Sequence, residues 1–271
     1  MMFLKKIKRY LGDRISICIL SYVDRMLNKV RTCAFSGGYF PLVMDSQQIL
    51  RNDGNVNSWS GGGYYSQCGQ DMFINFLFGN KNDGFFIDIG GNDPVKINNT
   101  YFFEKKGWSG LAFEPLEKYQ VKWKEERVTP CLPIALGDEE KDVVFREMDQ
   151  DYLSGIQGIN IDEIRKLISD GKVNVVNETI VKQRMLKDIL AERNIKEIDF
   201  ISLDVEGVEL QVLEGIDFHQ VNIKCFTIEN EDNMKMIYKI RRYLCDRGYW
   251  LIARLGQDDV FVSKNYFYQK R

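Results

Sequence analysis

The chain has 271 residues, of which 44% are hydrophobic, so one elaborated domain can bury a substantial core. Its 37 basic and 39 acidic side chains give a formal net charge of -2, which provides no general attraction for nucleic acid. The six cysteines have no CxxC spacing, which argues against a zinc knuckle or a disulfide framework and favours a reducing cytoplasm.

The first 65 residues predict a basic helix and an irregular segment, separate from a domain at 66–271. Basic side chains precede the apolar stretch 15–23, but no small-x-small cleavage pattern follows it, and the stretch is too short to span a bilayer. We expect this helix to pack on protein; the alternatives are the inner surface of an anionic membrane and another subunit of a homo-oligomer. Gly, Asn and Ser are frequent in 32–63, which predicts a lid or substrate loop.

From residue 66 onward, helical and strand patterns alternate in the rhythm of an α/β fold. The predicted elements are a helix within 66–79, strand 85–89, helix 100–106, strand 110–114, helix 116–126 and strand 129–135. The stretch 138–182 interrupts the rhythm with a strand at 143–147, a helix at 161–169 and the alternating run VNVVNETIV, so we interpret it as an insertion.

The rhythm returns after the insertion. The predicted elements there are helix 185–193, strand 198–204, helix 208–214, strand 223–229 and helix 233–247. Two last strands, 249–253 and 260–263, are joined by the turn Gly256-Gln257-Asp258, which predicts an antiparallel hairpin that closes the sheet.

The turn after strand 85–89, in the sequence GFFIDIGGNDPV, is a candidate ligand site. Gly90 and Gly91 stand at the carboxyl end of a buried strand, where open α/β sheets bind ligands, although an ordinary turn would use the same residue types. Four predicted strands have an acid at their carboxyl end, and we expect these acids to meet at one edge of the sheet: Asp88, Glu114, Asp204 and Glu229. Glu114 lies at the spacing from the glycine turn at which nucleotide folds place an acid for ribose hydroxyls; a helix-capping acid is the alternative.

Two nucleotide-binding motifs are absent from the sequence. The absence of GxGxxG weakens the hypothesis of a dinucleotide-dependent oxidoreductase. The absence of GxxxxGK[ST] argues against kinase or GTPase chemistry. There is also no basic stripe and no NPPY motif, so we expect no nucleic-acid substrate.

Four segments carry a more specific signal: SQCGQDMFINFLF, GFFIDIGGNDPVKINNTYFFEKKGWSGLAFEP, LKDIL and IDFISLDVEGVELQVLEGIDF. Together, over residues 66–230, they resemble the FkbM-like methyltransferases, which use S-adenosylmethionine. The resemblance implies a Rossmann-like sheet, mostly parallel with an antiparallel final strand and with helices on both faces. It also implies eight cofactor-binding residues: Gln67, Asp71, Asp88, Gly90, Asn92, Glu114, Ala135 and Leu136.

One position departs from the family pattern. Where the family commonly has a glycine after Asn-Asp, this chain has Pro94, which lacks an N–H and has a fixed φ. This substitution can alter the contact of the loop with the methionine part of the cofactor. We still expect a working loop, because proline suits the first turn of the helix that follows.

The candidate catalytic residues are Asp204, Glu229 and Asn230, which are also the candidate metal ligands. Oxygen ligands of these types suit Mg²⁺ or Mn²⁺, and the set is similar to the one by which catechol O-methyltransferases hold a cation. Metal-free base catalysis by Asp204 is the alternative, and Glu206 and Glu209 are open to a capping role at the next helix. The single histidine, His219, is predicted at the opposite edge and is not chosen as the base.

The resemblance implies an acceptor class as well. We expect an O-methyltransferase of polysaccharide biosynthesis that acts on a carbohydrate hydroxyl, in a nucleotide-linked sugar or a surface glycan. The alternatives are a lipid or polyketide-like acceptor, and a catalytically silent scaffold that keeps the fold. The segment 59–65 and the insertion residues Tyr152, Ser154 and Gln157 are the candidate acceptor contacts.

Overall fold

The computed structural model describes residues 63–149, 154–156, 169–229 and 234–269. The predicted basic helix, the irregular segment up to residue 62 and nearly all of the predicted helix 161–169 lie outside the described residues. The boundary between regions 1–65 and 66–271 therefore stays a prediction. No helix in the described part of the chain has the length and apolar character needed to cross a bilayer.

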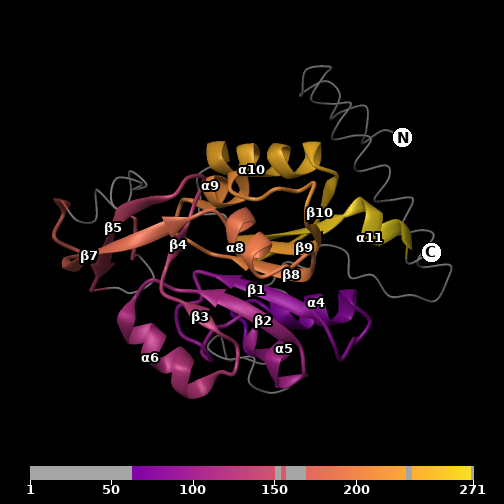
Figure 1. The fold of residues 1–271 in the computed structure, drawn as a ribbon, viewed down its shortest axis with the longest axis horizontal. Coiled ribbons are helices and arrows are strands. Elements are labelled where there is room, and N and C mark those ends of the chain that lie inside the picture. Colours follow the sequence, from indigo (N-terminus) through magenta and orange to yellow (C-terminus); the bar gives the residue numbers. More distant parts are fainter. Residues whose placement is uncertain (1–62, 150–153, 157–168, 230–233, 270–271) are drawn as a thin grey trace, which may run out of the picture. The chain divides into compact units, whose positions relative to one another are not determined.

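The main sheet has seven strands among the described residues (Figure 1). In spatial order they are β10 (Tyr249–Leu255), β11 (Asp258–Ser263), β9 (Asn222–Glu229), β8 (Glu197–Leu203), β1 (Phe85–Ile89), β2 (Ser109–Phe113) and β3 (Cys131–Leu132). Strand β11 is antiparallel to both of its neighbours, and β9, β8, β1, β2 and β3 are parallel. The predicted mixed α/β sheet with a reversed strand near its end is confirmed.

Helices cover both faces of this sheet, as predicted. They are α4 (Gln70–Leu77), α5 (Tyr101–Lys105), α6 (Glu117–Glu126), α8 (Leu186–Glu192), α9 (Glu209–Glu214), α10 (Met234–Asp246) and α11 (Lys264–Gln269). Figure 1 shows α9 and α10 on one side of the sheet and α5 and α6 on the other. The sheet thus has an apolar core on each face, and its central strands are buried on both sides.

Strand β1 lies in the middle of the sheet and contributes side chains to the apolar cores on both faces. Ile87 and Ile89 pack with α8, α9 and α10, while Phe86 packs with α4 and α5. Each of these three side chains is at most 2% exposed, and burying one stabilises the fold by about 1.5–3 kcal/mol. This packing fixes the position at which the strand ends, and therefore the position of the glycine turn.

The predicted strand 129–135 is wrong as a single element. The chain forms β3 and then β4 (Ala135–Leu136), which belong to different sheets. Pro133 lies between them, and the Ile134 N–H donates to the Leu132 carbonyl at 2.9 Å, which makes a three-residue turn around the proline. Proline favours this turn because its fixed φ suits the central position.

The insertion forms, together with β4, a second sheet that the sequence pattern did not reveal. Its order is β4, β7 (Val175–Arg184), β5 (Lys141–Met148) and β6 (Gly155–Ile156). Strand β7 is antiparallel to β5 and parallel to β4. Ala135, Val143, Val181 and Val208 form a small core between this sheet and the start of α9. The insertion is therefore joined to the region after β8.

Candidate active site

The carboxyl ends of β1, β2, β8 and β9 meet at one edge of the main sheet, as the acid-ended strands predicted. The Gly90 N–H donates to the Phe113 carbonyl and the Asp204 N–H to the Ile89 carbonyl, both at 3.0 Å. These bonds place the glycine turn between the end of β2 and the end of β8. Asp88, Glu114, Asp204 and Glu229, the candidate acids at the ends of these strands, lie at this edge.

Gly90 is required here for a reason that the sequence did not show. Its φ is 79°, and a Cβ added to it would lie 1.7 Å from the Asp204 carbonyl oxygen. No other residue type fits, because both the backbone conformation and the free space exclude a side chain. The glycine therefore brings the turn against the backbone of a candidate catalytic residue.

Asp88 lies beneath the turn and is 4% exposed. Its Oδ2 accepts hydrogen bonds from Thr100 Oγ1 at 2.5 Å and Asn98 Nδ2 at 3.1 Å. Burial raises the pKa of Asp88, while these bonds and the charge of Arg127 act in the opposite direction. Both hydrogen bonds engage the same oxygen, and Oδ1 accepts none from the described residues.

Asn92 and Glu114 are brought into direct contact. Glu114 Oε2 accepts the Asn92 N–H at 2.9 Å and Oε1 accepts the Leu116 N–H at 2.7 Å, so the carboxyl group is held in place by the backbone. Trp123 Nε1 donates to the Asn92 carbonyl at 2.9 Å. Burial raises the pKa of Glu114 to about 7, and the Asp88 charge adds to this.

The loop between the glycine turn and α5 corrects the interpretation of Pro94. Helix α5 begins only at Tyr101, so Pro94 is not in its first turn. Instead, Asp93 Oδ1 accepts the N–H groups of Val95 at 3.1 Å and Lys96 at 2.9 Å, and Ile97 has a φ of 55°. Pro94 thus occupies the first position of a separate, capped single turn, where its missing N–H is not needed.

The two residues predicted in the segment before α4 have different environments. Asp71 is fully buried and accepts the Tyr65 N–H at 2.6 Å and Ser66 Oγ at 2.5 Å, so it holds the chain that enters the helix. Gln67 is exposed, whereas Gln70 is buried and donates to Asp258 Oδ2 at 2.9 Å. A cofactor contact by Gln67 or Asp71 stays a prediction.

Ala135 and Leu136 form β4, and both are buried. They pair with Gln183 and Arg184 of β7, so they lie where the main sheet passes into the insertion. Their role beside an adenine also stays a prediction.

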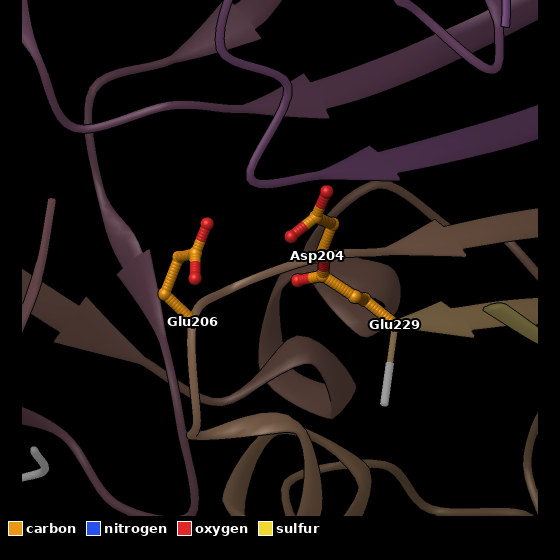
Figure 2. A group of neighbouring side chains, drawn as sticks. All are labelled: Asp204, Glu206 and Glu229. Atoms are coloured by element: carbon orange, nitrogen blue, oxygen red, sulfur yellow. The ribbon is translucent and has the colours of Figure 1, made fainter. Parts of the chain in front are cut away.

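Three carboxyl groups gather at the ends of β8 and β9. One oxygen each of Asp204, Glu206 and Glu229 lies within 4.8 Å of the others, and Figure 2 shows the side chains turned toward one another. Burial and the charges of Glu229 and Glu206 raise the pKa of Asp204 well above its usual value. Glu229 Oε2 is buried and has no hydrogen-bond partner among the described residues. Asn230 lies outside the described residues.

Glu206 is a site residue that the sequence left undecided. Glu209 caps the loop, because its Oε1 accepts the Gly207 N–H at 3.0 Å and the Val205 N–H at 3.4 Å. Glu206 has a φ of 56° and joins the carboxyl cluster instead. In the segment DVEGVE, no local signal separates these two glutamates.

Asp258 was assigned to a turn by its neighbours but lies on β11, opposite Glu229 in the register. Burial raises its pKa to about 7; the Gln70 hydrogen bond opposes this effect, and the Glu229 charge adds to it. His219 is exposed and precedes the amino end of β9, which places it away from this edge, as predicted.

Together these groups form two neighbouring sets at one edge. Asp88 and Glu114 can accept hydrogen bonds from a ligand on the glycine turn, and the cluster of Asp204, Glu206 and Glu229 can take up a proton or a cation. The family model described as Methyltransferase FkbM domain matches residues 88–251, which include both sets. No curated protein matches the chain significantly.

Proposed function

The chain belongs to the FkbM methyltransferase family, and on this basis we propose that it is an O-methyltransferase that uses S-adenosylmethionine and acts on a carbohydrate hydroxyl. The observation that carries the proposal is the carboxyl cluster beside the glycine turn. Because the Gly90 backbone lies directly against the backbone carbonyl of Asp204, a ligand on the turn would lie beside the residue whose carboxyl group we assign as the proton acceptor.

The residues at the turn fit S-adenosylmethionine. Bound there, this cofactor would supply a methyl group on a positively charged sulfur. Glu114 suits the ribose hydroxyls, because its two oxygens are already oriented by the N–H groups of Asn92 and Leu116 and keep lone pairs for further donors. Asp88 adds a second buried acid, which suits a ligand with positive charge.

Asp204 is the group that we assign to the acceptor. Asp204 would accept the proton of the acceptor hydroxyl, whose oxygen would take the methyl group that the cofactor supplies in exchange for its bond to sulfur. A carboxyl group whose pKa is raised by burial and by Glu229 and Glu206 is a stronger base than an ordinary aspartate. Alignment of the three reacting atoms supplies much of the remaining acceleration.

A divalent cation fits the same cluster and, when bound, would replace Asp204 as the group that activates the hydroxyl. Asp204, Glu206 and Glu229 would hold it, and the buried Glu229 Oε2, which lacks a partner among the described residues, is an oxygen that a cation would satisfy. Mg²⁺ or Mn²⁺ bound there would orient two neighbouring hydroxyls and lower the pKa of one. Asn230 remains a proposed further ligand.

The acceptor class rests on the family resemblance and on the polarity of the site. Three carboxyl groups offer many hydrogen-bond acceptors to a diol, which favours a sugar over an apolar lipid. The insertion borders the cluster, because a Cβ on Gly155 would lie 3.7 Å from Glu206 Cβ. A lipid or polyketide-like acceptor is the second candidate, and a location in the cytoplasm or at the membrane surface stays a prediction.

The proposal is tested first by cofactor binding. We expect calorimetry on chelator-treated protein to show S-adenosylmethionine binding that Asp88→Ala abolishes. Titration with Mg²⁺ or Mn²⁺ alone should give heat in the wild type and none in Glu229→Gln. No cofactor binding under any of these conditions would leave the scaffold alternative.

Methyl transfer is then measured with nucleotide sugars, glycan extracts and lipid extracts as separate acceptors. Asp204→Asn should bind the cofactor and lose at least about a hundredfold in rate, because it removes the base. Asp217→Asn, in the exposed loop before β9, is the matched control and should be as active as the wild type. If the methyl group is transferred only to the lipid extract, the carbohydrate acceptor is refuted and the lipid or polyketide-like acceptor takes its place.

A further inference from the structure

Arg127 is a buried cation that no part of the proposed mechanism uses. It follows α6, and its side chain is 0% exposed. The guanidinium carbon lies 4.4 Å from the centre of the Trp123 ring, and Nε lies 3.0 Å from Glu104 Oε2. Nε makes this ion pair without a hydrogen bond, so the guanidinium is held by the bonds of its two terminal nitrogens.

The terminal nitrogens of Arg127 donate hydrogen bonds to the loop between the glycine turn and α5. Nη1 donates to the Pro94 carbonyl at 2.7 Å and Nη2 contacts Thr100 Oγ1 at 3.2 Å. Nη1 is also 3.3 Å from Asn98 Oδ1. One planar group therefore holds the loop at its beginning and at its end.

Thr100 and Asn98 connect this guanidinium to Asp88. Both side chains donate to Asp88 Oδ2, and both are 3% exposed or less. The path from Arg127 to the acid below the glycine turn thus passes through single, fully buried side chains. The hydrogen bonds of such a buried network strengthen one another, because the local dielectric is low.

We propose that Arg127 is a positioning residue for the cofactor loop: it holds the single turn at Pro94 and, through Thr100 and Asn98, orients Asp88 toward the cofactor. This inference rests on the proposed function. It also explains how the chain uses a proline at this position, because Arg127 binds the carbonyl of Pro94 and needs nothing from its nitrogen. A loop fixed before the ligand arrives loses less conformational entropy on binding.

The loop also lies between the two acids assigned to the cofactor. Its first residue, Asn92, donates its N–H to Glu114, and its last part bonds to Asp88. A shift of the loop would therefore move both acids relative to each other. Loss of the Arg127 network should therefore weaken cofactor binding directly. Any effect on acceptor binding should be secondary.

The experiment measures S-adenosylmethionine affinity and thermal unfolding for four variants. Thr100→Val removes the hydroxyl that joins Arg127 to Asp88 without changing the side-chain volume, and Thr100→Ser keeps the hydroxyl. Thr129→Val is the matched control, because Thr129 Oγ1 bonds Glu104 on the other side of Arg127. Arg127→Lys keeps the charge and removes the fork.

We expect Thr100→Val and Arg127→Lys to bind the cofactor at least about tenfold more weakly, in line with a lost hydrogen bond to a charged group. Thr100→Ser should restore the affinity to within about twofold, and Thr129→Val should lower the unfolding temperature without weakening binding. If Arg127→Lys does not fold, the two Thr100 variants decide the question.

Two results would overturn the inference. In the first, Thr100→Val binds as tightly as the wild type; in the second, Thr129→Val weakens binding as much as Thr100→Val, which would mean a general loss of packing. Absence of binding to the wild type would instead refute the proposed function, and this inference would fall with it.

Discussion

Substituting Gly90 by alanine should separate the ends of β1 and β8. The new Cβ would lie 1.7 Å from the Asp204 carbonyl oxygen, and contacts below 3.0 Å are not tolerated, so the backbone must move. The left-handed conformation of an alanine at this φ costs about 1–2 kcal/mol, and the forced displacement of a packed backbone adds about 1–3 kcal/mol. We expect the free energy of unfolding to fall by about 2–5 kcal/mol.

The chain contains a control that isolates the clash. Gly171 also has a positive φ, 66°, but nothing lies within 4 Å of an added Cβ. Gly171→Ala should therefore lose no more than about 1–2 kcal/mol, and part of that is offset by the lower entropy of the unfolded chain. The difference between the two variants measures the contact with Asp204.

Urea unfolding followed by circular dichroism gives both free energies. Equal losses for Gly90→Ala and Gly171→Ala would refute the claim that the Asp204 carbonyl excludes a side chain at residue 90. Gly90→Ala should in addition lose methyl transfer, because the displaced carbonyl belongs to the residue that we assign as the base.

Three further changes test the buried polar groups. Because the folded pKa of Glu114 is about 7 against an ordinary 4.5, the folded protein binds more protons between these values. Its free energy of unfolding should therefore fall by up to about 3 kcal/mol as the pH rises through this window, with a flatter profile in Glu114→Gln. Asp204→Asn should raise the unfolding temperature, since it removes a carboxylate from a group of like charges; an unchanged or lower temperature would contradict the repulsion. Gln70→Ala should cost about 1–3 kcal/mol because Asp258 loses a buried donor, whereas Gln67→Ala at an exposed position should stay within about 0.5 kcal/mol and alter only cofactor affinity.

Strands with strong local signals could be predicted closely from the sequence. Strand β1 has the predicted bounds 85–89, because an apolar run stands between Gly84 and Gly90. The reversed hairpin of β10 and β11 was also predicted, since a glycine turn separates two apolar runs. The second sheet was not, because β4 and β7 lie far apart in the sequence and pair through contacts that no local pattern records.

The site residues at the ends of predicted strands could be predicted from the sequence. The site residues in or beside turns could not, because the turn conformation sets where their side chains point. Asp88, Glu114, Asp204 and Glu229 follow the strand-end rule and lie at one edge. Glu206 depends on one left-handed backbone angle, which a sequence pattern does not give. The sequence predicts a turn at Asp258 because it follows Gly256-Gln257, whereas in the structure it pairs with Glu229 on β11.

The two ends of the insertion meet. The Gly137 N–H donates to the Arg184 carbonyl at 3.0 Å, so the chain leaves the main fold and re-enters it at adjacent points. A segment with this geometry can be exchanged for that of a relative without stretching the rest of the chain. Since Gly155 of the insertion lies beside Glu206, such chimaeras would carry a different wall beside the carboxyl cluster and leave the glycine turn unchanged.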